Sequence, residues 1–178
     1  KYNDNSGQCT VTPVPFFWES FYKAGDDLLK ELIPQLVIEG KYSPIEKKLK
    51  QFGKNPDDLM QSFLGTDDGV SFRNKQLRSE FNLQISVPLV SYYLEMLKQN
   101  KIESQVLTFT DIFSNNPPTQ NVLTHFKHHF GFEFESLQWQ YEKNIISSIV
   151  EKKFDSLIGK ISALLSYHGC DIVLLSGR

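Results

Sequence analysis

The sequence predicts a helix-rich α/β fold in which a long carboxy-terminal helix packs over a small sheet. Two patterns near the end of the chain indicate this fold. Apolar residues between Tyr141 and Leu165 fall on one side of a helix, and the unbroken apolar run 172–175 follows shortly afterwards. A helix that leads into a strand covered on both faces is typical of α/β proteins. A hydrophobic content of 40% supports such a core and excludes a generally disordered chain.

The amino-terminal part of the chain is predicted to be helical after a short strand end at residues 9–12. From Phe16 to Glu39, apolar residues recur at near-helical spacing, with breaks at Gly25 and Pro34. Two aspartates follow Gly25 directly, and carboxylates in a first turn satisfy the free N–H groups of a helix. We therefore expect two helical pieces, the second of which begins at Gly25.

Two short helices are expected next, from Pro44 to Phe52 and from Pro56 to Leu64. Each has proline in its first turn, where the missing N–H costs nothing. Gly53 and Gly65 stand where a helix of this length ends.

The middle of the chain alternates between helix and strand. The apolar pattern from Phe72 to Gln99 predicts helix with a boundary at Pro88, because the residue before a proline avoids the α conformation. Residues Val106–Phe109 are predicted to form a strand. A further helix is expected from Asn121 to Phe130, ended by Gly131. We interpret residues 40–130 as a mainly helical inserted lobe, and residues 1–39 with 131–178 as the part that carries the sheet.

Two groups of side chains invite a chemical interpretation. His125, His128 and His129 occupy one predicted helix, but no cysteine or carboxylate lies at ligand spacing beside them. A metal site is conceivable there, and a surface or partly buried helix is favoured. Cys170 stands two residues after His168, where a small apolar thiol at the start of a buried strand is favoured over a thiolate–imidazole pair.

Several function classes are excluded or left without support. No phosphate loop, dinucleotide fingerprint or nucleophile elbow occurs, so the sequence predicts no catalytic and no metal-ligating residue. A net charge of −2 argues against nucleic-acid binding. No run approaches the roughly 18–20 apolar residues of a membrane span. Only two cysteines occur, far apart in the sequence, and they favour a reducing, cytoplasmic setting.

The last eight residues resemble a known family motif. The segment Asp171-Ile172-Val173-Leu174-Leu175-Ser176-Gly177-Arg178 follows a long amphipathic helix and is similar to the adenosine motif of the actin and heat-shock-chaperone ATPases. The sequence of this segment most resembles the SrfB virulence-factor family of predicted actin-like ATPases. The resemblance implies that Ser176, Gly177 and Arg178 face adenosine, with Ser176 in the place of the family's first glycine.

A second segment is similar to the phosphate-binding turn of the same superfamily. Ala24-Gly25-Asp26-Asp27-Leu28 resembles the Gly-Gly-acidic-Asp segment of the chaperone ATPases, with Ala24 in the place of the first glycine. The resemblance implies that Gly25 lies near the nucleotide phosphates and Asp27 near the water shell of the bound metal.

These resemblances imply that the chain is an internal fragment of an actin-like ATPase domain. The expected ligand is ATP with Mg in the full-length parent, and the expected partners are the nucleotide, the remaining half of that domain and further proteins. The family's first phosphate loop and first catalytic aspartate have no counterpart here, so the fragment alone is expected to hold no cofactor and to be inactive. The alternative is a helical protein-interaction module without a nucleotide site. Five aromatic residues crowded between Phe16 and Tyr22 suit either a core or an interface.

Overall fold

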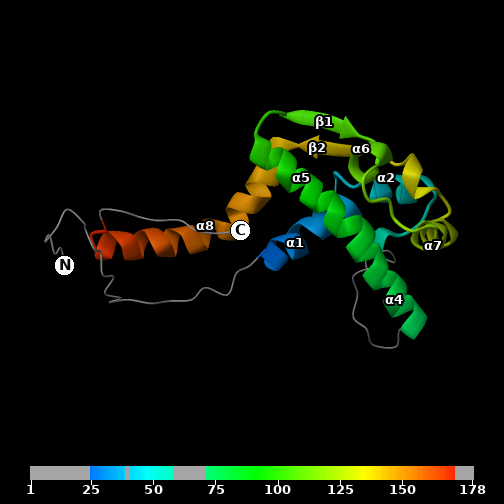
Figure 1. Ribbon diagram of the computed structural model, residues 1–178, viewed down its shortest axis with the longest axis horizontal. Helices are drawn as coiled ribbons and strands as arrows, with labels where there is room; N and C mark the ends of the chain where they lie inside the picture. Colours follow the sequence, from blue (N-terminus) through cyan, green and yellow to red (C-terminus); the bar gives the residue numbers. More distant parts are fainter. Residues whose placement is uncertain (1–24, 39–40, 58–70, 171–178) are drawn as a thin grey trace, which may run out of the picture.

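The computed structural model describes residues 25–38, 41–57 and 71–170 (Figure 1). It is helix-rich with one small sheet, as the sequence predicts at the level of fold class. In chain order the elements are α1 (Gly25–Ile33), η1 (Pro34–Ile38), α2 (Pro44–Gln51), α4 (Phe72–Phe81), η2 (Asn82–Ser86), α5 (Val87–Gln99), β1 (Ser104–Leu107), α6 (Phe109–Phe113), α7 (Gln120–Phe130), η3 (Phe134–Ser136), β2 (Trp139–Glu142) and α8 (Lys143–Tyr167). Of the three η segments, η1 and η2 are π-helical and η3 is a 3-10 turn.

The sheet of the described residues consists of β1 and β2, which pair antiparallel with Leu107 opposite Trp139. The strand predicted at Val106–Phe109 therefore exists but begins and ends earlier, because Thr108 caps α6. The partner strand β2 was not predicted, and Tyr141 belongs to it rather than to the long helix. The terminal strands expected at residues 9–12 and 172–175 lie outside the described residues.

Two prolines, Pro34 and Pro88, adjoin π-helical turns rather than helix breaks. Pro34 opens η1, which continues α1 without interruption. The predicted boundary at Pro88 is wrong, because α4, η2 and α5 form one continuous helical segment from 72 to 99. Within it, the N–H of Val87 donates to the carbonyl of Asn82, five residues back. This wider turn relieves the contact between a proline ring and the carbonyl four residues earlier, so the helix continues.

One aromatic cluster fills the core of the described residues. Phe134, fully buried, lies at its centre, with its ring centroid 5.2 Å from that of Phe126 and 5.6 Å from that of Trp139. Three further rings, those of Phe81, Phe109 and Phe113, lie within 6.4 Å of it. Edge-to-face and tilted pairs of this kind add to the burial of apolar area. The core also includes residues of α1, η1 and α2, so both parts of the predicted domain division contribute to it, and the division itself stays a prediction.

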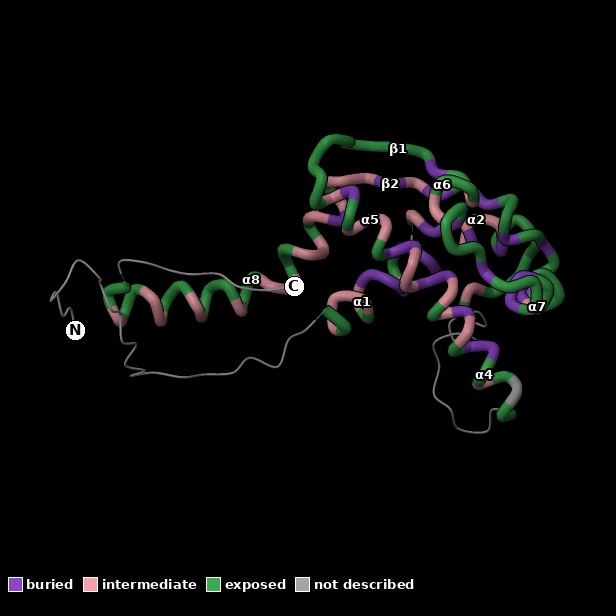
Figure 2. The backbone as a smooth tube through the Cα atoms, viewed as in Figure 1, coloured by how far each residue is buried: buried purple, intermediate pink, exposed green. Residues whose placement is uncertain are grey.

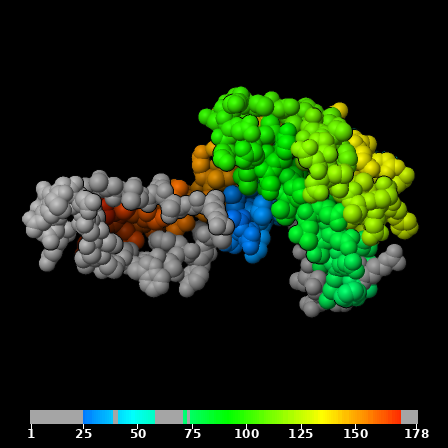
Figure 3. Space-filling model, viewed as in Figure 1, coloured from blue at the N-terminus to red at the C-terminus, as the bar shows by residue number. Residues whose placement is uncertain are grey.

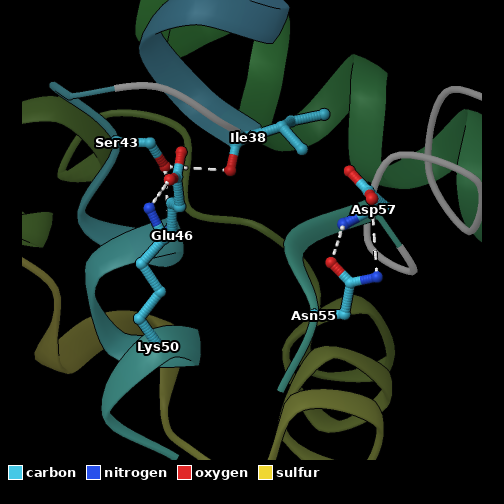
Figure 4. A network of polar contacts seen from close by, with 6 residues as sticks. All are labelled: Ile38, Ser43, Glu46, Lys50, Asn55 and Asp57. Carbon is cyan, nitrogen blue, oxygen red and sulfur yellow. Dashed lines mark hydrogen bonds and ion pairs between the residues drawn. The ribbon is translucent and has the colours of Figure 1, made fainter. Parts of the chain in front are cut away.

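Ser43 joins the end of η1 to the start of α2 (Figure 4). Its buried hydroxyl donates to the carbonyls of Val37 at 2.8 Å and Ile38 at 3.1 Å, and accepts from the N–H of Glu46 at 3.2 Å. One side chain therefore satisfies backbone groups at two helix ends, which explains why α2 begins where the sequence predicts.

Predicted helix ends hold where glycine supplies a positive φ. Gly53 follows α2 with φ 65°, and Gly131 ends α7 with φ 84°. The helix expected from Pro56 to Leu64 is described only as far as Asp57, and the rest of it lies outside the described residues.

Helix α8 extends away from the other described elements, which we call the body (Figure 1). It has 25 residues, and its only buried residue is Ile146, near its start. The remainder is half-buried or exposed along its whole length (Figure 2). Among the described elements, its main contacts are with α1 and α5. The sequence predicts that this helix packs over a sheet whose strand 172–175 lies outside the described residues, so that contact stays a prediction.

Candidate functional site

The residues expected at a nucleotide are only partly described. Gly25 is the exposed first residue of α1, and a Cβ placed on it would meet nothing within 4 Å. Asp27 lies in the first turn of the same helix, with its carboxylate 4.0 Å from the ammonium of Lys30. Ser176, Gly177 and Arg178 lie outside the described residues, so the expected meeting of the two motifs stays a prediction.

The histidines on α7 do not assemble a recognisable metal site. The rings of His125 and His129 stack with centroids 6.1 Å apart, and His128 is exposed. In residues 25–38, 41–57 and 71–170, no group of three or more histidine, cysteine, aspartate or glutamate side chains could hold a metal ion.

Cys170 is exposed, which corrects the expectation of a buried thiol. Gly169, with φ 60°, turns the chain after α8 so that the N–H of Cys170 donates to the carbonyl of Leu165 at 3.1 Å. The residue therefore belongs to the closing turn of α8, where its side chain is open to solvent.

The buried polar side chains of the body are structural. Tyr93 donates to the carbonyl of Gln140 at 3.3 Å, and burial raises the pKa of Tyr93. Burial also raises the pKa of Tyr141, whose hydroxyl, like the indole N–H of Trp139 and the hydroxyl of Ser86, has no hydrogen-bond partner among the described residues. Tyrosines whose charged form is disfavoured by burial are poor acid–base catalysts near neutral pH.

The most distinctive surface of the described residues is an apolar line along α8. It consists of five side chains spaced four, three, four and three residues apart, which we call the α8 seam: Val150, Phe154, Leu157, Ile161 and Leu164. All five are half-buried. Two more apolar residues widen the line on one side, namely Ile158, which is 61% exposed, and the half-buried Leu165. The average spacing of 3.5 residues keeps an apolar line facing a single helical partner over several turns.

The α8 seam has few charges beside it. Lys153, near its start, donates to Glu31 of α1 at 3.3 Å, which fixes the proximal half of α8 to the body. Beyond that point, Asp155 and Lys160 are the only acidic or basic residues up to residue 170, histidine aside. The space-filling view shows this distal half extending away from the body (Figure 3). A surface that is apolar and nearly uncharged suits an apolar partner.

Sequence reasoning found the apolar stripe and predicted that it packs over a sheet. Part of that sheet, residues 172–175, lies outside the described residues, so this contact stays a prediction. Among the described elements, α8 packs mainly against α1 and α5.

Comparison with known families places the chain. A family model described as "Virulence factor SrfB" matches residues 1–178, which is the whole sequence. The chain belongs to the SrfB family. No curated protein and no solved structure matches it. The resemblance of the carboxy-terminal segment to SrfB is thereby confirmed, and the wider relationship to actin-like ATPases stays a prediction.

The sequence of this SrfB-family chain predicts no membrane span, and the structure tests this prediction for the part of the chain that it describes. None of the helices in that part of the chain combines the length and the apolar character that a bilayer crossing requires.

Proposed function

We propose that this chain is a helical interaction module of an SrfB-family protein, and that the α8 seam is the surface by which it binds an apolar α-helix. The observation that carries the proposal is the uninterrupted heptad spacing from Val150 to Leu164 on a helix whose only buried residue is Ile146. Heptad spacing suits a helical partner, because a second helix can follow such a line over successive turns.

The apolar area of the seam contributes favourably to binding. Burying a large apolar side chain completely contributes about 1.5–3 kcal/mol, and the seam side chains are already half-buried, so each would add only part of that amount. Five such residues, together with the exposed Ile158, would still offset part of the loss of freedom on association, which costs several kcal/mol. We therefore expect affinities typical of short helix-in-groove contacts, with specificity set by the spacing.

A labelled peptide of residues 143–167, the sequence of α8 itself, is a suitable helical probe. Its fluorescence anisotropy should rise on addition of the chain, and the substitution Leu157→Asp in the chain should weaken binding at least tenfold. Ser156→Asp, one position along and exposed, is the matched control and should leave binding unchanged. Equal binding by the two variants would contradict the proposal.

A second candidate function is nucleotide binding by a longer protein that contains this chain. The open space around Gly25 favours it, because a ligand can approach the backbone at the start of α1. In this proposal Gly25 lies beside the phosphates of ATP, Asp27 beside the water shell of Mg, and the pair Ser176 and Gly177 with Arg178 beside adenosine.

A titration with a fluorescent ATP analogue and Mg distinguishes the two proposed functions. The longer protein is expected to bind and this chain alone to show no binding, because ATP sites are assembled from both halves of such domains. Asp27→Ala should weaken binding by the longer protein, whereas Asp57→Ala, on the exposed loop after α2, should not. Tight binding by the chain alone, or no effect of Asp27→Ala, would overturn this candidate.

A further inference from the structure

We infer that a second surface of this chain binds a short acidic protein segment that carries an aromatic side chain. This surface, which we call the Phe52 surface, consists of the exposed ring of Phe52 and the ammonium groups of Lys48 and Lys54. It lies where the end of α2 meets α7 and η3, on the side of the body away from α8 (Figure 1). The inference therefore goes beyond the proposed function and does not depend on it.

The ring of Phe52 is the outer member of an aromatic stack that continues into the core. It is 59% exposed, and it stacks on the ring of Phe132 with centroids 6.0 Å apart and planes 13° apart. Phe132 is buried and meets Phe126 edge to face at a centroid distance of 5.4 Å. An exposed ring that a buried ring holds in place loses little freedom when a ligand packs against it.

Two lysine ammonium groups are held beside this stack. The Nζ of Lys48 lies 5.3 Å from the ring centroid of Phe132 and donates to the hydroxyl of Ser136 at 2.6 Å. The Nζ of Lys54 donates to two carbonyls at the end of α7, one of them that of Phe130 at 3.1 Å. The last carbonyls of a helix favour a cation. These contacts fix both ammonium groups and leave their charge in place, because all the partners are neutral.

The positive charge of the surface is not balanced locally. In the part of the chain that the structure describes, neither Lys48 nor Lys54 forms an ion pair with a carboxylate, and the neighbouring Lys127 and Glu133 pair with each other. An ammonium group has three donors, of which Lys48 uses one and Lys54 two, so each keeps an N–H for a ligand. Carboxylates beside an aromatic side chain complement such a surface.

The surrounding charges favour a short protein segment over a nucleic acid. A nucleic-acid strand brings a row of phosphates, and its binding requires a correspondingly long row of cations. The chain as a whole has a net charge of −2, and the exposed Glu135 stands next to Ser136, the partner of Lys48. A peptide with a few carboxylates around one aromatic residue needs only the two ammonium groups and the ring of Phe52.

A dye-labelled peptide in which one tryptophan stands between glutamates is a suitable probe. Its fluorescence anisotropy should rise to saturation on addition of the chain, and binding should weaken in high salt. A peptide with alanine in place of the tryptophan should bind about fivefold more weakly, and so should one with lysines in place of the glutamates. Absence of saturable binding, or equal binding of the lysine peptide, would overturn the inference.

Variants of the chain locate the binding on this surface. Phe52→Ala should weaken binding of the acidic peptide about fivefold, whereas Phe72→Ala, which removes an 83% exposed ring on α4, should leave it unchanged. Lys48→Met keeps the apolar stem and should weaken binding about threefold. Lys47→Met removes the same charge one position along and is its control. Circular dichroism shows whether each variant is folded. Unchanged binding by folded Phe52→Ala and Lys48→Met would exclude this surface.

Two expected gains of binding distinguish recognition from damage to the surface. Lys48→Glu should bind the lysine peptide more tightly than the unmodified chain does, because it reverses the charge beside the ring. Glu135→Gln should bind the acidic peptide about twofold more tightly, because it removes a nearby negative charge. If neither gain appears, the inference fails. An oligothymidylate that binds more tightly than the acidic peptide, and depends equally on Phe52, would assign the surface to single-stranded nucleic acid instead and would also refute it.

Discussion

The core around Phe134 and the distal half of α8 are made of similar side chains, mainly phenylalanine, leucine and isoleucine, but they differ in what surrounds them. In the core, rings from α4, α6, α7 and β2 converge on Phe134, which is fully buried. Along the α8 seam, the same kinds of residue form a single line and stay half-buried. Apolar periodicity therefore indicates which face of a helix is suited to packing. Whether that face is buried within the chain depends on how many other elements converge on it.

The largest expected effect tests this difference directly. Phe134→Ala should lower the free energy of unfolding by about 3–5 kcal/mol, because it leaves a cavity where several rings meet. Ile158→Ala, at a side chain that is 61% exposed, should change it by less than about 0.5 kcal/mol. Denaturant unfolding of both variants provides the measurement. Similar losses for the two would mean that α8 and the body form one core after all.

A smaller effect is expected where helices join within the body. Ser43→Ala should cost about 2 kcal/mol, since it leaves the carbonyls of Val37 and Ile38 without their donor in a buried place. Ser71→Ala removes the exposed cap of α4, where the hydroxyl accepts from the N–H of Asn74 at 3.3 Å, and should cost under about 1 kcal/mol. Thermal unfolding compares the two caps, and an equal loss would argue against a special role for burial.

The ion pair between body and α8 should contribute less still. Glu31→Gln is expected to lower the free energy of unfolding by under about 0.5 kcal/mol, because Glu31 and Lys153 are 43% and 27% exposed and solvent screens them. The difference should shrink further in high salt. Glu95→Gln, at the more exposed pair with Lys98 on α5, is the control. A loss of several kcal/mol for Glu31→Gln would show that α8 is held far more rigidly than its exposure indicates.

The smallest expected effect concerns the stability of the protein at acidic pH. Asp111 accepts from the hydroxyl and the N–H of Thr108, each at 2.7 Å, and these bonds hold its pKa below the usual value. A depressed folded pKa contributes stability above the unfolded pKa of about 3.9, and this contribution is lost as the pH falls through the folded pKa. Asp111→Asn should therefore make the decline of stability below about pH 4 slightly shallower.

Carboxyl NMR titration checks the cause. Thr108→Val should move the pKa of Asp111 back toward its ordinary value, since the hydroxyl bond is the largest contribution to the shift. An unchanged pKa in this variant would assign the shift to the backbone bond alone.

What could be predicted from the sequence follows local chemistry. The start of α2 at Pro44 and the end of α7 at Gly131 each depend on a cap, a proline or a glycine within a few residues. These signals act over one turn of helix, so they survive without knowledge of the fold.

The rest depended on contacts between distant segments. β2 is four residues long and was absorbed into the pattern of the long helix, because Tyr141 is apolar at a position that continues the stripe. Its strand conformation is set by pairing with β1, some 35 residues earlier. The central place of Phe134 likewise cannot be recognised from the local sequence, since the rings around it come from four different elements.

The candidate site shows the same difference between features set by local sequence and features set by contacts between distant segments. The stripe on α8 was found from spacing alone, and periodicity carries no information about which elements it packs against. Gly25 and Asp27 lie in a helix, and their role toward a nucleotide remains a proposal that rests on family resemblance.

The π-helical turn at η2 links the number of residues in the helical segment 72–99 to the presence of Pro88. Such a turn holds one residue more than an α turn while the helices on either side keep their faces. Deleting the exposed Leu83 would leave a regular helix, and Pro88 would then press against a carbonyl that η2 now turns aside. Evolution could shorten this helix only after replacing the proline, so the two features are expected to be gained and lost together among related sequences.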